Sequence, residues 1–168
     1  HPVHGLSGVR LVQILGGGGD PAAEGHATHL VRRLADLLGA EATFVARSVD
    51  IYTDHLKETL TAAARHRGAA FVEIFQNCNI FNDGAWRDFT DREVREERML
   101  VLEHGKPMIF GKDRDRGIRL NGLHPEVVTI GENGVTEADL LVHDEQAEDP
   151  YLALVLSHWT MDMSQVSS

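Results

Sequence analysis

A single cysteine, Cys78, is the strongest nucleophile and the softest metal ligand in this sequence of 168 residues. It lies in the polar run Gln76-Asn-Cys-Asn79, directly after an apolar segment. A lone cysteine is most often a small buried apolar residue, but among polar neighbours it can equally serve as a thiolate ligand. A nucleophilic role needs a base beside the thiol, and the sequence identifies none. The buried residue and the thiolate ligand therefore stay open as alternatives.

A run of four glycines and an aspartate, residues 16–20, lies between an apolar segment and a helical pattern. Glycines let the backbone approach a phosphate closely, and the first turn of a helix supplies N–H donors. The run matches neither a GxGxxG motif nor a lysine-containing P-loop. It is therefore either an anion-binding turn or a tight turn with a purely structural role.

Histidine is abundant, and His26 and His29 stand three positions apart beside Glu24 on a predicted helix. Imidazole and carboxylate groups at this spacing bind zinc when ligands from elsewhere complete the site. No HExxH pattern accompanies them, so we favour two surface histidines over a histidine-based metalloenzyme. His1 and His4 leave the same two alternatives open.

Short apolar strands and helices alternate along the first half of the sequence. We predict strands at 9–15, 42–47 and 69–75, and helices at 21–38 and from residue 50 or 53 to about 67. This alternation predicts an α/β fold with a mostly parallel sheet flanked by helices. Ligands bind at the carboxyl ends of the strands in such sheets. The candidate ligand-binding loops are therefore those at 16–20, 48–50 and 76–84.

The pattern changes after Gly84. We expect a charge-dense helix over 91–98 and a β-hairpin that joins 99–103 to 107–110. A charged turn at 112–116, a strand at 127–130 and a closing helix over 150–161 follow. No low-complexity linker separates the halves. The predicted organisation is an α/β region over 1–84 and a hairpin-containing C-terminal extension over 85–168 that packs on it.

Composition excludes several classes of protein. The sequence has 16 Lys and Arg against 26 Asp and Glu, a formal net charge of −10, and this argues against a nucleic-acid partner. With 42% hydrophobic residues it is typical of a globular domain. No apolar run approaches the roughly 20 residues of a membrane span. One cysteine excludes an intrachain disulfide and favours the reducing cytoplasm, so we expect a cytoplasmic protein.

Several stretches resemble a known family. The run that contains Gly39-Ala-Glu-Ala-Thr-Phe44, over 38–50, and the run that contains Gln76-Asn-Cys78, over 66–84, look like the β subunit of 2-oxoacid:ferredoxin oxidoreductases. The greatest likeness is to the 2-oxoglutarate type. It continues through 103–111 and 131–145, so the resemblance covers about residues 38–156.

The resemblance implies a role in the oxidative decarboxylation of a 2-oxoacid. In that family the β subunit carries the thiamine-diphosphate-binding domain, an α subunit completes the enzyme, and coenzyme A and ferredoxin accept the acyl group and the electrons. In cluster-bearing members, a cysteine at the position of Cys78 is one of four [4Fe–4S] ligands. The resemblance thus assigns Cys78 to a cluster, and implies thiamine diphosphate with Mg²⁺ as cofactor and an α subunit as partner.

The amino-terminal part departs from the family pattern. The run His1-Pro-Val-His-Gly5 is similar to a family loop near the cofactor, which implies that His4 lies near the thiamine. The family's Gly-Asp-Gly-Asp turn falls on residues 17–20, which assigns Gly17, Gly19 and Asp20 to the diphosphate. Gly18 then stands where the family has an aspartate that binds Mg²⁺.

Two family segments have no counterpart in the sequence: an Asn-containing segment of the Mg²⁺ site and a Cys-Pro-x-Cys segment. Three accounts of these departures are a fragment of a longer subunit, a gene product with deletions, and a degenerate subunit. The resemblance therefore implies a β subunit of a 2-oxoglutarate-type oxidoreductase. The alternative is a non-catalytic subunit or fragment that docks on an α subunit without binding thiamine diphosphate. The sequence assigns no catalytic residue.

Overall fold

A computed structural model describes residues 43–81, 83–84, 90–147, 149 and 151–158, together with the backbone of 8–14. At 157 and 158 it also describes the backbone alone. The sequence-predicted helix over 21–38 lies outside the described residues, as do the glycine run at 16–20, His4, His26 and His29.

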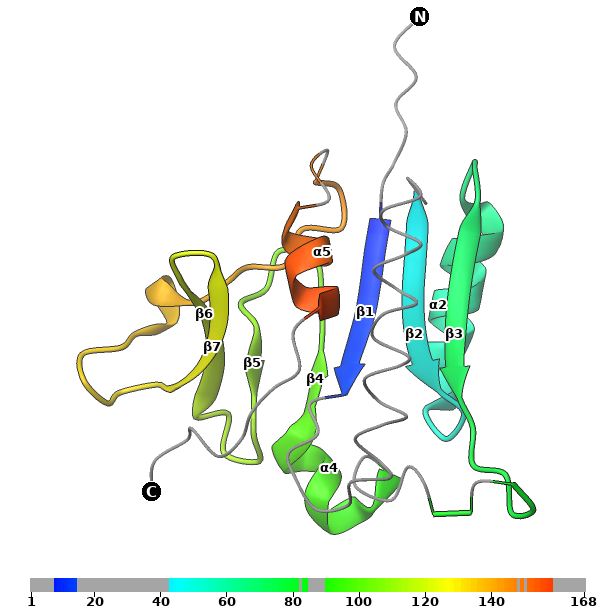
Figure 1. The fold of residues 1–168 in the computed structure, drawn as a ribbon, viewed down its shortest axis with the longest axis horizontal. Coiled ribbons are helices and arrows are strands. Elements are labelled where there is room, and N and C mark those ends of the chain that lie inside the picture. The colour runs from blue at the N-terminus through cyan, green and yellow to red at the C-terminus, as the bar shows by residue number, and fades with distance from the viewer. Residues whose placement is uncertain are drawn as a thin grey trace, which may run out of the picture.

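A four-stranded sheet forms the larger part of the described fold (Figure 1). Its strands are β1 (Gly8–Ile14), β2 (Phe44–Val49), β3 (Ala70–Phe75) and β4 (Met99–Val101), in the order β3-β2-β1-β4. The first three strands run parallel, and β4 pairs with β1 in the antiparallel sense. The three predicted strands of the first half are thus confirmed, with ends shifted by one or two residues.

Helix α2 (Thr53–Arg65) connects β2 to β3 and packs on one face of the sheet. Its sequence-predicted extent, from residue 50 or 53 to about 67, is confirmed. The helix ends at His66, and Gly68 follows with a φ of +143°. A side chain at that position would place its Cβ 2.7 Å from the hydroxyl oxygen of Thr43, so this connection requires glycine. Helix and strands together confirm the α/β fold with a parallel sheet.

A second sheet contains β5 (Ile109–Phe110), β6 (Arg116–Asn121) and β7 (His124–Thr129), all antiparallel. Strands β6 and β7 form a hairpin around a two-residue turn, in which Gly122 has a φ of +62°. The extension therefore contains a hairpin, but not the predicted one, and residues 112–116 lead into it as a charged turn, with Arg116 opening β6.

The predicted hairpin between 99–103 and 107–110 is wrong. Strand β4 pairs with β1 of the first sheet, and β5 pairs with β6 of the second. The connecting residues bond instead to a distant segment: the Gly105 N–H donates to the His143 carbonyl at 2.8 Å, and the Met108 N–H donates to the Leu141 carbonyl at 2.8 Å. Because residues 141–143 occupy these backbone groups, the two strands separate into different sheets.

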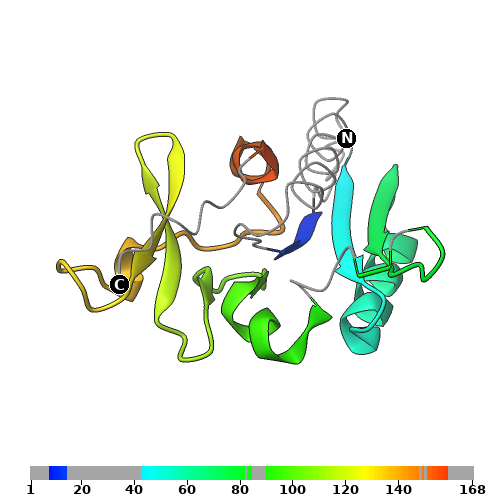
Figure 2. The ribbon, with the colours of Figure 1, turned by 60° about the horizontal axis from the view of Figure 1, so that its bottom comes forward.

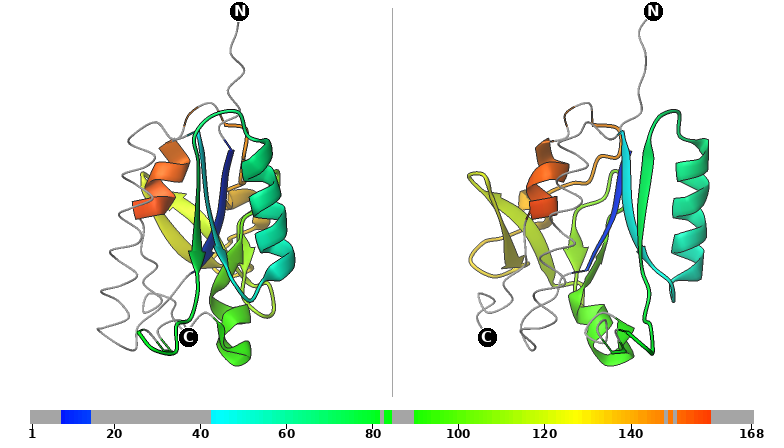
Figure 3. Two further views of the ribbon diagram at one scale, coloured as in Figure 1. Left: turned by 90° about the vertical axis from the view of Figure 1, so that its right-hand side faces the viewer. Right: turned by 45° about the vertical axis from the view of Figure 1, so that its right-hand side comes forward.

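Three short helices complete the described fold: α4 (Arg92–Arg98), the 3₁₀ helix η1 (Glu137–Asp139) and α5 (Tyr151–His158). The charge-dense helix is confirmed, and its cap is Asp91, whose side chain accepts the Glu93 N–H at 3.2 Å. Helix α5 lies within the predicted closing helix. It lies on the sheet face opposite to α2 (Figures 2 and 3). None of the described helices has the length and apolar character that a membrane span requires.

One buried cluster joins the two sheets and α5. It consists of Val45 from β2, Leu156 from α5, and side chains on or next to β4, β5 and β6: Leu100, Leu102, Met108, Phe110 and Ile118. A smaller cluster of Ile109, Val135 and Leu140 lies under η1 and the loop before it. Burial of these side chains supplies the main driving force that packs the second sheet against the first.

Candidate functional site

The carboxyl ends of β2 and β3 lie at the same edge of the parallel sheet (Figure 1). The polar segment that follows β3, residues 76–84, carries Cys78, as the sequence predicts. We refer to residues 76–84, apart from residue 82, as the Cys78 loop. The other predicted site residues, His4, Gly17, Gly19 and Asp20, lie outside the described residues, and their roles stay predictions. The candidate site is therefore built around Cys78.

The side chain of Asn77 joins the two ends of the Cys78 loop. Its Nδ2 group donates to Oδ1 of Asn79 at 2.9 Å and to Oδ1 of Asp83 at 3.1 Å. Its Oδ1 atom accepts the Gly84 N–H at 2.9 Å. Gly84 has a φ of +76°, which glycine adopts without strain. One carboxamide thus connects three points of the loop that carries the thiol.

Cys78 is half-buried, and its sulfur faces backbone donors. The N–H groups of Ile80 and Phe81 hydrogen-bond to it and hold the pKa of the Cys78 thiol below its ordinary value, against a smaller opposing effect of desolvation. A thiolate, not a thiol, is the form that binds metals and clusters. The loop therefore favours the chemical form of cysteine that a metal or cluster ligand requires.

Two large apolar side chains next to the thiol face solvent. Ile80 is 84% exposed and Phe81 is 88% exposed, the highest values among the large apolar side chains of the described residues. Neighbouring apolar side chains exposed to this degree are typical of surfaces that a partner covers. They also show that side-chain packing contributes little to the shape of this loop.

A buried ion pair joins β2 and β3 close to their carboxyl ends. Nε of Arg47, on β2, donates to Oε2 of Glu73, on β3, at 2.7 Å. Burial lowers the pKa of the Arg47 guanidinium, and the Glu73 carboxylate opposes that effect. The guanidinium carbon of Arg47 also lies 4.9 Å from the centre of the Phe75 ring, the last residue of β3. This network stabilises the strand end from which the Cys78 loop departs.

A second polar contact holds α2 to the carboxyl end of β2. The buried hydroxyl of Ser48 lies 2.9 Å from Nδ1 of His55, and the buried hydroxyl of Thr59 lies 3.5 Å from the same nitrogen. The loop after β2 is bonded to the carboxyl end of β3 as well, since the Asp50 N–H donates to the Phe75 carbonyl at 3.0 Å. The carboxyl end of β2 is therefore joined both to α2 and to the carboxyl end of β3.

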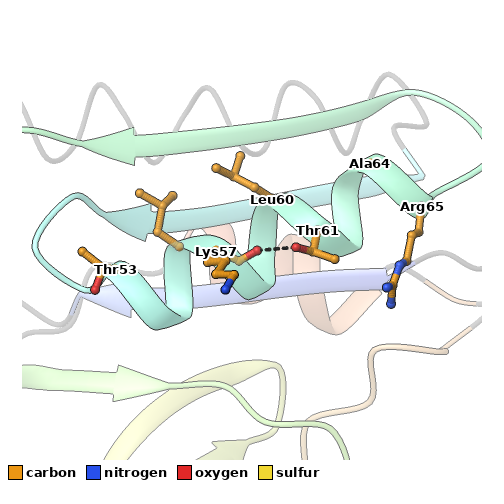
Figure 4. A pocket seen from close by; sticks show the side chains of 7 residues that line it. Thr53, Lys57, Leu60, Thr61, Ala64 and Arg65 are labelled. Atoms are coloured by element: carbon orange, nitrogen blue, oxygen red, sulfur yellow. Dashed lines mark hydrogen bonds between the residues drawn. The ribbon is translucent and has the colours of Figure 1, made fainter.

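A groove of about 540 Å³ runs along the outer face of α2 (Figure 4). Leu56, Leu60 and Ala64 give it an apolar floor, and Lys57 and Arg65 border it. The Thr61 hydroxyl in this groove donates to the Lys57 carbonyl of its own helix at 2.7 Å. All these side chains come from one helix and offer no acid–base pair, so we assign no chemistry to the groove.

Metal ligands from the described residues do not converge. Within 43–81, 83–84, 90–147, 149 and 151–158, no group of three or more His, Cys, Asp or Glu side chains could hold a metal ion. A [4Fe–4S] cluster takes four thiolates, and the sequence contains one cysteine. The chemistry of Cys78 fits one ligand of such a cluster, whose remaining thiolates would have to come from outside this sequence.

Sequence reasoning located the loop but missed the residues that support it. Charged residues at equivalent places in two apolar strands, Arg47 and Glu73, are a signal of a cross-strand ion pair once the register is known. Asn77 has no such signal. Its importance depends on the return of the chain to Gly84, which local sequence does not show.

Known proteins similar to this chain carry related names. Over 120 residues it is 45% identical to "2-oxoglutarate oxidoreductase subunit KorB" of Mycobacterium tuberculosis, a match covering 71% of this chain and 31% of that protein. Over 73 residues it is 42% identical to "2-oxoacid:ferredoxin oxidoreductase 1, subunit beta" of Aeropyrum pernix, covering 44% and 21%. Over 64 residues it is 31% identical to a "2-oxoacid:ferredoxin oxidoreductase subunit beta" of Saccharolobus solfataricus, covering 38% and 21%.

The matched part of the chain thus spans less than a third of the length of these relatives. No protein-family profile matches the chain, and no solved structure does.

Proposed function

Because this chain belongs to the family of 2-oxoacid:ferredoxin oxidoreductase β subunits, we propose that it acts in the oxidative decarboxylation of a 2-oxoacid of the 2-oxoglutarate type. The observation that carries the proposal is the 45% identity over 120 residues to a protein named 2-oxoglutarate oxidoreductase subunit. The products are an acyl-coenzyme A and carbon dioxide, and the electrons pass to ferredoxin.

Cys78 is proposed as one thiolate ligand of a [4Fe–4S] cluster. The support is its position after a parallel strand, its partial exposure, and the two backbone N–H groups that stabilise its anionic form. When bound, such a cluster supplies one-electron transfer between the oxidised substrate and ferredoxin. This chain contributes the thiolate and the hydrogen bonds to its sulfur.

Thiamine diphosphate is the proposed organic cofactor, and it supplies the carbanion chemistry of decarboxylation when bound. We assign Gly17, Gly19 and Asp20 to the diphosphate and His4 to the vicinity of the thiamine. Backbone N–H groups of a glycine turn suit a diphosphate. Mg²⁺ requires oxygen ligands, and Gly18 offers no side-chain oxygen, so the remaining oxygens must come from other groups.

An α subunit of the same oxidoreductase is the proposed partner. The names of the relatives designate β subunits, which implies a complex. The exposed Ile80 and Phe81 beside Cys78 support a role in a larger assembly, since side chains of this size are costly to leave in water.

Turnover by the complex tests the proposal. The chain is co-expressed with the α subunit, purified without oxygen, and assayed for ferredoxin reduction with 2-oxoglutarate and coenzyme A. We expect reduction that depends on both compounds and on added thiamine diphosphate. A folded complex that reduces no ferredoxin with 2-oxoglutarate, pyruvate or branched 2-oxoacids would contradict the proposed reaction.

Gly18 favours a second candidate, a subunit that docks on the α subunit without binding thiamine diphosphate. A calorimetric titration of thiamine diphosphate and Mg²⁺ into the complex separates the two candidates. Micromolar binding that EDTA abolishes supports the catalytic subunit. A folded complex that releases no heat of binding supports the docking subunit.

A further inference from the structure

We propose that Asn77 is a positioning residue, whose carboxamide holds the Cys78 loop in the shape that directs the backbone N–H groups of Ile80 and Phe81 at the Cys78 sulfur. The positioning role concerns this chain alone. Its consequence for a cluster rests on the proposed function of Cys78 as a ligand.

The orientation of the Asn77 carboxamide follows from its partners. The Oδ1 atom of Asp83 serves as a hydrogen-bond acceptor, so the group that faces it at 3.1 Å must be the Nδ2 donor. The Gly84 N–H only donates, so the atom that receives it at 2.9 Å must be Oδ1. Both conditions select the same orientation. The carboxamide therefore connects the start of the loop to its end with complementary partners.

The Cys78 loop depends on these hydrogen bonds because its apolar side chains do not pack. Ile80 and Phe81 are 84% and 88% exposed, so burial fixes neither residue. Their backbone N–H groups are nevertheless the ones that meet the sulfur. When the side chains of a loop do not pack, its conformation is determined by the hydrogen bonds that its backbone and side chains make. Asn77 supplies three of these bonds, to residues 79, 83 and 84.

A consequence for a bound cluster follows from general chemistry. Hydrogen bonds to a ligating sulfur are among the factors that set the reduction potential of an iron–sulfur cluster. They stabilise the more negative, reduced state, so their loss lowers the potential. Asn77 acts on the potential through the loop and does not touch the cluster itself, as is usual for residues that orient a metal ligand.

Hydrogen exchange at single amides tests the positioning role in the chain without any cofactor. In N77A we expect the amides of Ile80, Phe81 and Gly84 to exchange about fivefold faster, the factor that one ordinary hydrogen bond represents. In N77D a carboxylate faces the Asp83 carboxylate, so we expect a larger increase. Amides of β2 and β3 should not change, which shows that the variants fold.

Matched variants sharpen this test. D83N keeps an oxygen acceptor for Nδ2 and should stay close to the parent chain. N121A removes a carboxamide that donates to Glu126 at 3.3 Å on the β6–β7 hairpin, and it should leave the Cys78 loop unchanged. Unchanged exchange at Ile80 and Phe81 in both N77A and N77D would overturn the positioning role.

The reduction potential of the complex purified without oxygen tests the consequence. We expect a lower cluster potential in N77A than in the parent complex or in N121A. Faster exchange with an unchanged potential would overturn the tuning of the cluster by Asn77. If the parent complex contains no cluster, the proposed role of Cys78 fails, and the exchange measurement still decides whether Asn77 positions the loop.

Discussion

Arg47 and Glu73 lie opposite each other on adjacent parallel strands, and their side chains form a buried ion pair with Nε 2.7 Å from Oε2. Their side chains are 5% and 10% exposed. Because Arg47 also lies over the ring of Phe75, the pair connects β2 to the residue from which the Cys78 loop begins. The ion pair therefore links the core of the sheet to the candidate site.

Removing one partner of this ion pair should lower the free energy of unfolding more than removing both partners. E73L leaves a buried guanidinium without its carboxylate, and we expect a loss of about 3–5 kcal/mol in the free energy of unfolding. In the double variant R47M/E73L no charge remains, and stability should return to within about 1 kcal/mol of the parent chain. Urea unfolding of the three proteins measures this difference. Equal losses in the single and double variants would contradict the account.

The contact between Ser48 and His55 should contribute to the docking of α2 on the sheet. S48A removes a fully buried hydroxyl that lies 2.9 Å from Nδ1 of His55, and we expect a loss of about 1–2 kcal/mol. T61A is a matched control, since the Thr61 hydroxyl is exposed and bonds to its own helix. It should change the unfolding free energy by less than about 0.5 kcal/mol. A similar loss in both variants would show that Ser48 is not special.

Gly117 of β6 allows Leu140 to approach the second sheet. A Cβ added at Gly117 would lie 2.5 Å from both Cδ atoms of Leu140, which is buried in the smaller core cluster. We expect G117A to lose about 1–3 kcal/mol through overpacking. In the double variant G117A/L140A the added methyl group gains space. We therefore expect the double variant to lose less unfolding free energy than the sum of the losses of G117A and L140A. Thermal unfolding of the full set gives this coupling, and additive losses would argue against the close contact.

The ionised form of Asp139 should stabilise the chain, and protonation of Asp139 in acid should remove that contribution. The Thr136 N–H and then the Thr136 hydroxyl, both 2.8 Å from Oδ2, hold the pKa of Asp139 below its ordinary value. A lowered folded-state pKa stabilises the fold above the pKa of the unfolded chain, and this stability disappears as the pH falls through the folded value. We expect D139N to flatten the fall in stability below pH of about 4. Parallel pH curves for the parent chain and D139N would contradict this role.

The first half of the described fold follows closely from local patterns. Strands β2 and β3 and helix α2 begin and end within about two residues of the ranges that the sequence predicts. The hairpin over 99–110 was wrong for a physical reason. Two apolar strands with a short polar link resemble a hairpin, but the backbone of 105–108 bonds to residues 141–143, and no local pattern contains that long-range pairing.

The candidate site was predictable in place but not in detail. The end of a strong apolar strand followed by Gln76, Asn77 and Cys78 indicates a loop at the ligand-binding edge of the sheet. The hydrogen bonds that shape the loop arise only after the chain turns back at Gly84. The ion pair between β2 and β3 depends on strand register, which sequence alone does not determine.

The iron content and electron paramagnetic resonance spectrum of the complex with and without the Cys78 thiol test the central claim most directly. The α-subunit complex is purified without oxygen and reduced with dithionite, for the parent chain and for C78A. We predict a [4Fe–4S] signal in the parent complex, and a C78A complex that still contains the α subunit but has lost the signal and most of its iron. A C78A complex with the signal and iron of the parent would contradict the assignment of Cys78 as a cluster ligand.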